Sequence, residues 1–244
     1  MNKFKKYSFL LFPFTFSFAN NANWQDFDNN LYVGGGFALN SSSVNQFGVA
    51  SNNFGVAQIG TTALFGNGIY FNIEGVAKFT SGGSFIGNWY NGVLKFGYSI
   101  QPDDNLNFTP YLSLGYGDSG AFYSTASNLS YGVGLLSELM FNSNLSFYLD
   151  LGYQLQNYNT AINNDFSTNV LGGFAAYSLS GNPSIIDASL GLKYITQGGY
   201  YINPFFKFEN YQQSFIQSSS GLSYGGLNSI VNQYQFGVNV GASI

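Results

Sequence analysis

The sequence of 244 residues contains no cysteine, no histidine and no arginine. Without cysteine there is no disulfide framework and no thiolate site. Without histidine, zinc and copper lose their usual ligands, and a serine or water nucleophile loses its usual proton-transfer partner. We therefore expect no enzymatic activity, no metal site and no cofactor.

Charge is scarce as well. Charged residues make up 7% of the chain, with seven basic against eleven acidic residues, whereas ordinary soluble domains contain about 25% charged residues. So few basic residues leave no electrostatic footprint for a nucleic acid, which we exclude as a partner. Aromatic residues, in contrast, reach 19%. Because charge is so scarce, the surface is either shielded from water or covered by uncharged polar groups.

The first residues predict an export signal. Three lysines precede a short apolar run over residues 8–18, and Ser17 and Ala19 are small residues at the two positions that a signal peptidase inspects. We predict that residues 1–19 are a signal peptide and that residues 20–244 form one domain. The apolar run is too short for a spanning helix, which needs roughly 20 apolar residues, and no later stretch resembles a membrane helix.

Apolar and polar residues alternate along most of the chain, which is the pattern of β-strands rather than of helices. The cleanest run alternates large apolar residues with polar or small ones over about ten residues; its apolar members are Leu106, Phe108, Pro110, Leu112, Leu114 and Tyr116. The sequence therefore predicts an all-β protein whose strands have one apolar and one polar face.

Nine charged residues fall within these strands, and all nine lie on the face opposite the large apolar side chains. They are Glu74, Lys78, Lys95, Glu138, Asp150, Asp187, Lys193, Lys207 and Glu209. Successive side chains of a strand point to opposite sides. The apolar face must therefore meet a medium that does not tolerate charge.

Short and long connections alternate along the chain. Short turns are predicted at 66–68, 101–105, 142–144 and 197–199, and longer polar loops near 40–53, 81–88, 118–128, 157–168 and 217–228. This alternation is typical of an antiparallel up-and-down barrel with short turns at one end and longer loops at the other.

The stretch 158–183 decides the number of strands. If it is one outer loop, the alternation of short and long connections is kept and about ten strands result. If residues 170–179 form a strand, the alternation fails soon afterwards and the alternative is twelve strands. We prefer ten.

A membrane-spanning barrel explains these patterns better than a secreted soluble β-sandwich adhesin, which remains the alternative. The strands have the length that a tilted membrane strand needs, while soluble strands average 5–6 residues. The polar face carries few charges, and aromatic residues such as Phe79, Tyr116 and Phe141 stand near the ends of the apolar faces, as in interfacial girdles. Backbone groups in hydrocarbon must be paired, so such strands close into a barrel in contact with lipid.

Three segments resemble small Gram-negative outer-membrane β-barrel proteins of the porin-like, opacity-type and surface-antigen families: FTPYLSLGYG at 108–117, YGVG at 131–134, and NLS at 144–146 with DLGY at 150–153. The resemblance covers about residues 105–155 closely and the remainder only as a pattern. It implies insertion into the cell outer membrane and a role in adhesion, surface antigenicity, membrane integrity or limited solute passage. Such proteins typically end in Phe, whereas this chain ends in Ile244.

The nine inward charges predict a filled lumen. Four lysines can pair with five carboxylates inside the barrel, because buried charges need partners, and Tyr32, Tyr111, Tyr148 and Tyr201 add bulk. We therefore predict a non-enzymatic barrel with a structural or surface-interaction role and a largely blocked lumen. In the alternative, the charges are hydrated and the barrel is a small porin-like channel for ions or small solutes.

Other features have plainer interpretations. Asp103 and Asp104 are expected to be turn residues, and Asp26 and Asp28 to be solvated. Gly34-Gly35-Gly36 predicts close packing against a neighbouring strand, because no helix follows to form a phosphate loop. The outer loops are rich in Asn, Ser, Gly, Tyr and Phe, which either shield the barrel or contact host or cell-surface molecules.

Overall fold

The computed structural model describes residues 22–44, 48–80, 89–118, 127–157, 176–179, 184–219 and 222–244. The predicted signal peptide and most of the predicted outer loops at 81–88, 118–128 and 157–168 lie outside these residues, so they remain predictions. Within the described residues, no helix has the length and apolarity needed to cross a bilayer.

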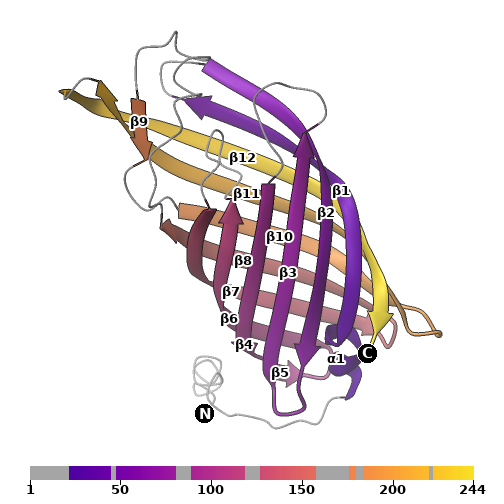
Figure 1. Cartoon of the computed structure of the whole chain (residues 1–244). Helices are drawn as coiled ribbons and strands as arrows, with labels where there is room; N and C mark the ends of the chain where they lie inside the picture. The colour runs from indigo at the N-terminus through magenta and orange to yellow at the C-terminus, as the bar shows by residue number, and fades with distance from the viewer. Residues whose placement is uncertain are drawn as a thin grey trace, which may run out of the picture.

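The described chain contains one short helix and twelve strands (Figure 1). They are α1 (Ala22–Asp28), β1 (Asn30–Val44), β2 (Gly48–Leu64), β3 (Ile69–Thr80), β4 (Trp89–Tyr98), β5 (Ile100–Asp103), β6 (Leu106–Asp118), β7 (Ser127–Asn142), β8 (Leu145–Asn157), β9 (Ala176–Leu179), β10 (Ser184–Ile195), β11 (Tyr200–Ser219) and β12 (Leu222–Ser243).

Ten of these strands form a closed antiparallel barrel. Each pairs with the next long strand along the chain, and β1 pairs with β12, for example Leu31 with Ala242, which closes the sheet on itself. β5 pairs with β6, and β9 pairs only with the outer part of β11. The predicted up-and-down barrel of about ten strands is therefore confirmed, and the two additional strands are short side pieces of four residues each.

Two predicted loops are instead strand. The expected loop at 40–53 is largely taken up by the end of β1 and the start of β2, and that at 217–228 by the ends of β11 and β12. These stretches are polar and lack an apolar face, so side-chain alternation does not reveal them. Backbone pairing needs no apolar side chain; the pair of Ser42 with Ala50 continues the first hairpin, and that of Ser218 with Ser223 continues the second.

The two faces of the barrel are inverted relative to a soluble protein. Outward side chains are mostly large and apolar, and Leu112 and Tyr116 are 62% and 65% exposed. Inward side chains are mostly polar, and Glu138 and Gln233 are 1% and 0% exposed. A predominantly apolar exterior on a closed barrel is the surface that lipid covers.

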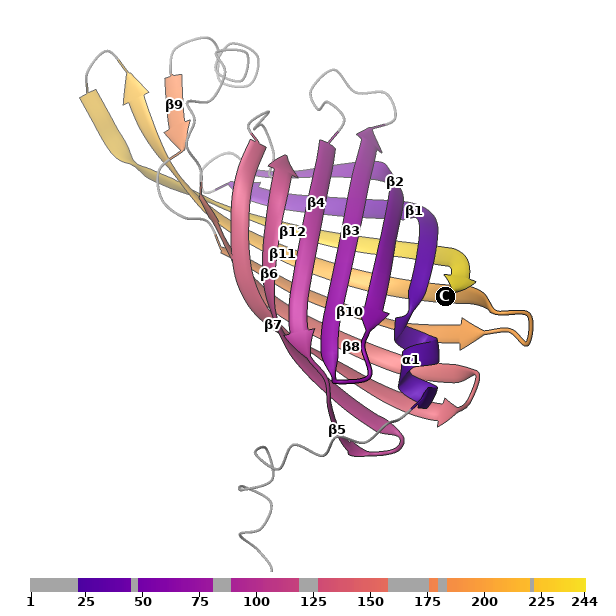
Figure 2. The ribbon, with the colours of Figure 1, turned by 60° about the horizontal axis from the view of Figure 1, so that its bottom comes forward.

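The four short turns lie at the end of the barrel that also holds α1 and the C-terminus (Figure 2). Two of these turns use a glycine with positive φ, Gly68 at 86° and Gly199 at 76°, a conformation that costs glycine little. Ile244 N–H donates to the carbonyl of Asn29 at 2.9 Å, which joins the two ends of the sheet. Because outer-membrane barrels have short periplasmic turns, we take this as the inner end.

The three consecutive glycines of β1 lie against β12. A Cβ on Gly36 would fall 2.0 Å from the carbonyl oxygen of Phe236, whereas one on Gly35, which points outward, would meet nothing closer than 3.6 Å. This geometry agrees with the predicted close packing of the glycine run against a neighbouring strand.

Candidate functional site in the barrel lumen

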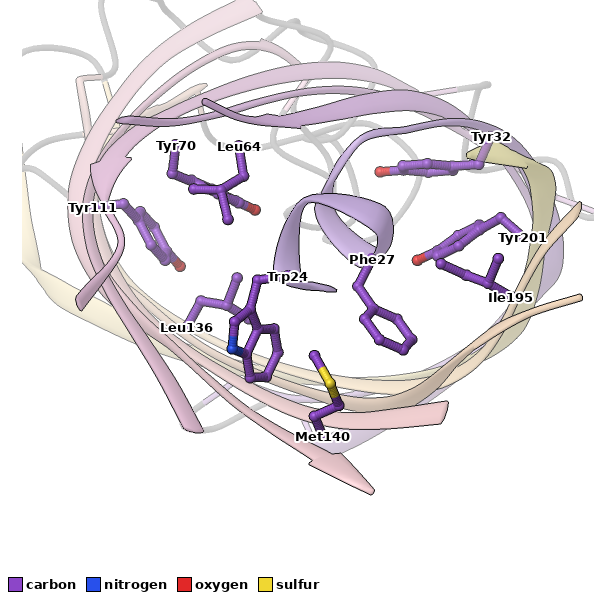
Figure 3. Packing of buried hydrophobic residues seen from close by; sticks show 10 residues of the cluster. All are labelled: Trp24, Phe27, Tyr32, Leu64, Tyr70, Tyr111, Leu136, Met140, Ile195 and Tyr201. Carbon is purple, nitrogen blue, oxygen red and sulfur yellow. The ribbon is translucent and has the colours of Figure 1, made fainter. Parts of the chain in front are cut away.

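A helical plug fills the inner end of the lumen. Helix α1 lies inside the barrel, and its side chains Trp24 and Phe27 are fully buried (Figure 3). They belong to a cluster of inward residues that also includes Leu64, Tyr70, Leu136, Met140 and Ile195. Trp24 Nε1 donates to the carbonyl of Asp104 at 3.1 Å, which ties the helix to the β5–β6 turn.

A buried charge triad fixes the end of this helix. Lys193 Nζ lies 2.5 Å from Asp28 Oδ1 and also pairs with Glu138 Oε1. Asn107 Nδ2 donates to the other Glu138 oxygen at 2.9 Å. The expectation that Asp28 is solvated is therefore wrong, because its side chain is 0% exposed. The side chain of Asp26 lies outside the described part of the structure.

The sequence carries only a weak signal for this burial. Trp24, Phe27 and Asp28 stand at i, i+3 and i+4, so on a helix they share one face. A short stretch before the first strand gave no reason to expect a helix, since an isolated helix of seven residues is unstable in water. Only the barrel interior supplies the partners that hold it.

A second layer of charged side chains lies on the outer side of the plug. Lys95 pairs with Asp150, whose other oxygen accepts a hydrogen bond from Tyr111 Oη at 2.6 Å. Lys95 Nζ also lies 4.6 Å from the centre of the Tyr111 ring, within the range of a cation–π contact. Both partners of this ion pair are therefore held by the same tyrosine.

Two carboxylates at this level have no ion-pair partner among the described residues. Glu74 accepts a hydrogen bond from Tyr32 Oη at 2.8 Å, and Asp187 accepts one from Gln154 Nε2 at 3.3 Å. The predicted pairing of lysines with carboxylates thus leaves these two acids to neutral donors.

Glu209 is the centre of a third layer, towards the outer end. Its oxygens lie 3.3 Å from Lys78 Nζ and 2.8 Å from Lys207 Nζ. Tyr211 Oη and Gln233 Nε2 donate to the same carboxylate at 2.7 and 2.9 Å. One acid therefore collects two lysines and two neutral donors, which compensates for its removal from water.

The structure thus places all nine predicted charged residues on the inward face and brings seven of them into ion pairs. Sequence reasoning missed Asp28, which makes the inward groups six carboxylates and four lysines. Three of the four predicted tyrosines, Tyr32, Tyr111 and Tyr201, are at most 5% exposed. Tyr148 packs against the plug cluster, and its Oη lies 3.5 Å from Asn203 Oδ1.

One polar cavity lies in the middle of the lumen. It has a volume of about 100 Å³ and is lined by inward groups that include Tyr32, Glu74, Asp187, Lys207 and Asn239. Because one water occupies roughly 30 Å³ in the liquid, this space holds a few waters. Its walls offer amides, hydroxyls, carboxylates and ammonium groups, so it suits small polar species rather than apolar ones.

Most charged groups of the lumen are engaged with one another. The chain has no histidine or cysteine, and the described residues contain no group of three or more acidic side chains placed to hold a metal ion. Its carboxylates are already engaged by lysine, tyrosine or amide groups. The arrangement is that of a packed polar core.

No protein family and no curated protein sequence matches this chain, but its fold is shared with solved outer-membrane proteins. The outer membrane protease OmpT from Escherichia coli is 7% identical, with 88% of this chain and 95% of that chain covered and a TM-score of 0.50. OprG from Pseudomonas aeruginosa is 13% identical over 89% and 97% of the two chains, with a TM-score of 0.41. Ail, the attachment invasion locus protein of Yersinia pestis, is 9% identical over 87% and 98%, with a TM-score of 0.32.

At 7% identity, the likeness to OmpT shows the fold alone and no particular activity. The closed barrel and its lipid-facing belt make this chain a membrane-spanning β-barrel, a fold that it shares with the outer-membrane protein OmpT.

Proposed function

We propose that this protein is a non-enzymatic outer-membrane barrel with a structural or surface-interaction role, and that its lumen does not conduct steadily. The observation that supports this most strongly is the filling of the lumen at three levels: the α1 plug with its charge triad, the Lys95–Asp150 layer, and the Glu209 layer. A barrel of ten strands has little room to begin with, since eight strands are filled by side chains and sixteen leave an aqueous channel.

The absence of histidine supports the non-enzymatic part of the proposal. Proton transfer in catalysis most often uses histidine, and a hydroxyl or water nucleophile needs a base beside it. The six inward carboxylates are held in the packed interior, where a large substrate has no access.

Planar-bilayer conductance tests the filled lumen. We expect no steady current from the wild-type protein, and measurable openings from Tyr32→Ala/Tyr111→Ala, which removes two rings from the lumen. Tyr116→Ala is the matched control, because Tyr116 points outward, and it should behave like the wild type. Steady wild-type currents of the size of general porins would contradict the proposal.

A small channel is the second candidate, and the polar cavity of about 100 Å³ in the middle of the lumen favours it. Small, cation-selective currents would support it, because the lumen contains six carboxylates against four lysines. The same bilayer experiment therefore separates the two candidates.

The outer strands support the surface-interaction part of the proposal. β11 and β12 have 20 and 22 residues, and their outer halves project past the barrel wall together with β9 (Figures 1 and 2). Shortening this hairpin between Gln213 and Asn228 should reduce adhesion of expressing bacteria to immobilised extracellular-matrix proteins or glycans while leaving barrel folding intact. Unchanged adhesion would argue for a purely structural role.

A further inference from the structure

An apolar groove runs over the outer surface of the barrel wall, across β2, β3, β4 and β6. Its volume is about 630 Å³. The floor is formed by four small residues at outward positions, where large apolar residues are more common on the exterior; they are Ala57, Gly75, Ala77 and Gly92.

The register of the sheet puts these positions side by side. Gly75 pairs with Ile59 on one side and with Gly92 on the other, and Gly92 pairs in turn with Tyr116. One row across four strands therefore reads large, small, small, large. Ile59 and Tyr116 are 57% and 65% exposed, so they stand up as the two walls of a trough.

The backbone does not require these two glycines. A Cβ on Gly75 would meet its nearest neighbour, Ile59 Cγ2, at 3.6 Å, and one on Gly92 would lie 3.8 Å from the carbonyl oxygen of Tyr116. Both distances are ordinary contacts, unlike the 2.0 Å clash at Gly36. Glycine within a strand weakens it, by about 0.5–1 kcal/mol relative to alanine, and often marks a place where something else approaches closely. Because nothing inside the barrel occupies this space, the approach is from outside.

The groove lies within the lipid-facing belt and towards its outer end. Gly92 is near the outer end of β4 and Tyr116 near that of β6, and Tyr90 stands beside the groove and is 56% exposed. Tyrosines of this kind mark the membrane interface. The groove is therefore continuous with the surface that lipid already covers, in the outer leaflet.

We propose that this groove is a binding site for a hydrocarbon chain of an outer-leaflet lipid. A chain fits between walls that are three strand spacings apart, which is roughly 14 Å at strand spacings of about 4.8 Å. The wall of a second barrel would meet the protruding Ile59, Tyr90 and Tyr116 before reaching the floor. Recognition is through the chain and not the headgroup phosphate, because the four lysines of residues 20–244 point into the lumen.

Native mass spectrometry of the detergent-purified protein tests this proposal. The probes are lipid A and a phosphatidylethanolamine and a phosphatidylglycerol with identical saturated chains. We expect a complex of the protein with one lipid to appear even when less than one equivalent of lipid is added. The two phospholipids should bind alike. Gly75→Leu/Gly92→Leu, which fills the floor, should weaken retention about tenfold.

Ala188→Leu is the matched control, because Ala188 is an outward-facing small residue on β10, outside the groove, and it should retain lipid as the wild type does. Heat-modifiable gel migration confirms that each variant is folded; if the double leucine variant does not fold, Ala77→Leu replaces it. Equal retention by wild type and the filled variant would overturn the proposal. So would binding that follows the headgroup, or a dimer that forms in place of the lipid complex and is lost when the floor is filled.

Discussion

The most consequential single residue in the lumen is Lys193. Its ammonium group is the only cation that either Asp28 or Glu138 contacts among the described residues, and both carboxylates are buried. Lys207 differs, because it is 26% exposed at its side chain and shares Glu209 with Lys78. The loss of Lys193 would leave Asp28 and Glu138 without a lysine partner, whereas the loss of Lys207 would leave Lys78 beside Glu209. The two lysines can therefore be compared directly.

Lys193→Met should lower the free energy of unfolding by about 3–5 kcal/mol, since removing one partner of a buried ion pair leaves uncompensated charge. Lys207→Met should cost roughly 1 kcal/mol or less, because Glu209 keeps Lys78, Tyr211 and Gln233. Urea titration of the protein in bilayers, followed by heat-modifiable migration, measures both. Equal losses in the two variants would show that the triad is not a stability centre.

At the scale of elements, α1 is the one whose place depends entirely on the others. A seven-residue helix does not persist alone. Trp24 and Phe27 therefore remain ordered only because the barrel interior surrounds them, as Figure 3 shows. The helix in turn closes the inner end of the lumen.

Tryptophan fluorescence can locate this helix. The chain has two tryptophans, so Trp89→Phe leaves Trp24 as the only emitter. We expect blue-shifted emission that neither acrylamide nor brominated lipid chains quench, because Trp24 is fully buried inside the barrel.

A reporter on the lipid side provides the contrast for Trp24. Tyr116→Trp in a Trp24→Phe/Trp89→Phe background places the only indole on the outward face, and brominated chains should quench it. Quenching of Trp24 by the same lipids would mean that α1 lies at the membrane surface and not in the lumen.

At the scale of the whole molecule, stability depends on closure. Each of the ten barrel strands pairs with two others, and β12 pairs with both β1 and β11. An open sheet in hydrocarbon would leave a row of unpaired backbone groups, each of which costs several kcal/mol.

The full-length protein should therefore partition with membranes after a urea wash and migrate faster on gels before heating than after it. A variant that lacks residues 222–244 cannot close the barrel, so it should show no heat-dependent shift. A soluble, detergent-free monomer of the full chain would contradict the membrane barrel.

Much of this architecture could be predicted from residues alone. The alternation around Leu112 and Leu114 gave the strands and their lipid face, and turns such as 66–68 and 197–199 gave the connectivity and its sidedness. The inward position of the charged residues followed from the same alternation of side chains between the two faces of a strand. Their pairing did not, because partners such as Lys78 and Glu209 are 131 residues apart and meet only across the closed lumen.

Three features could not be predicted. Backbone pairing alone extends the polar ends of β1, β2, β11 and β12 beyond the barrel, so no apolar face marks these ends in the sequence. The burial of Asp28 depends on a helix that has no stability of its own. The groove around Gly75 and Gly92 depends on register, which aligns small residues from different strands that are unremarkable in their own segments.

The sequence by itself determined the class of protein. The alternation of side chains between the two faces of a strand is a local property, so neighbouring residues already define it. It also determined that these 244 residues supply no imidazole and no thiol, because folding cannot add a residue type that the sequence lacks. Only the tertiary structure decided which charges pair, what fills the inner end of the lumen and where the exterior is hollow. Each of these depends on strands that are far apart in the chain and become neighbours only when the barrel closes.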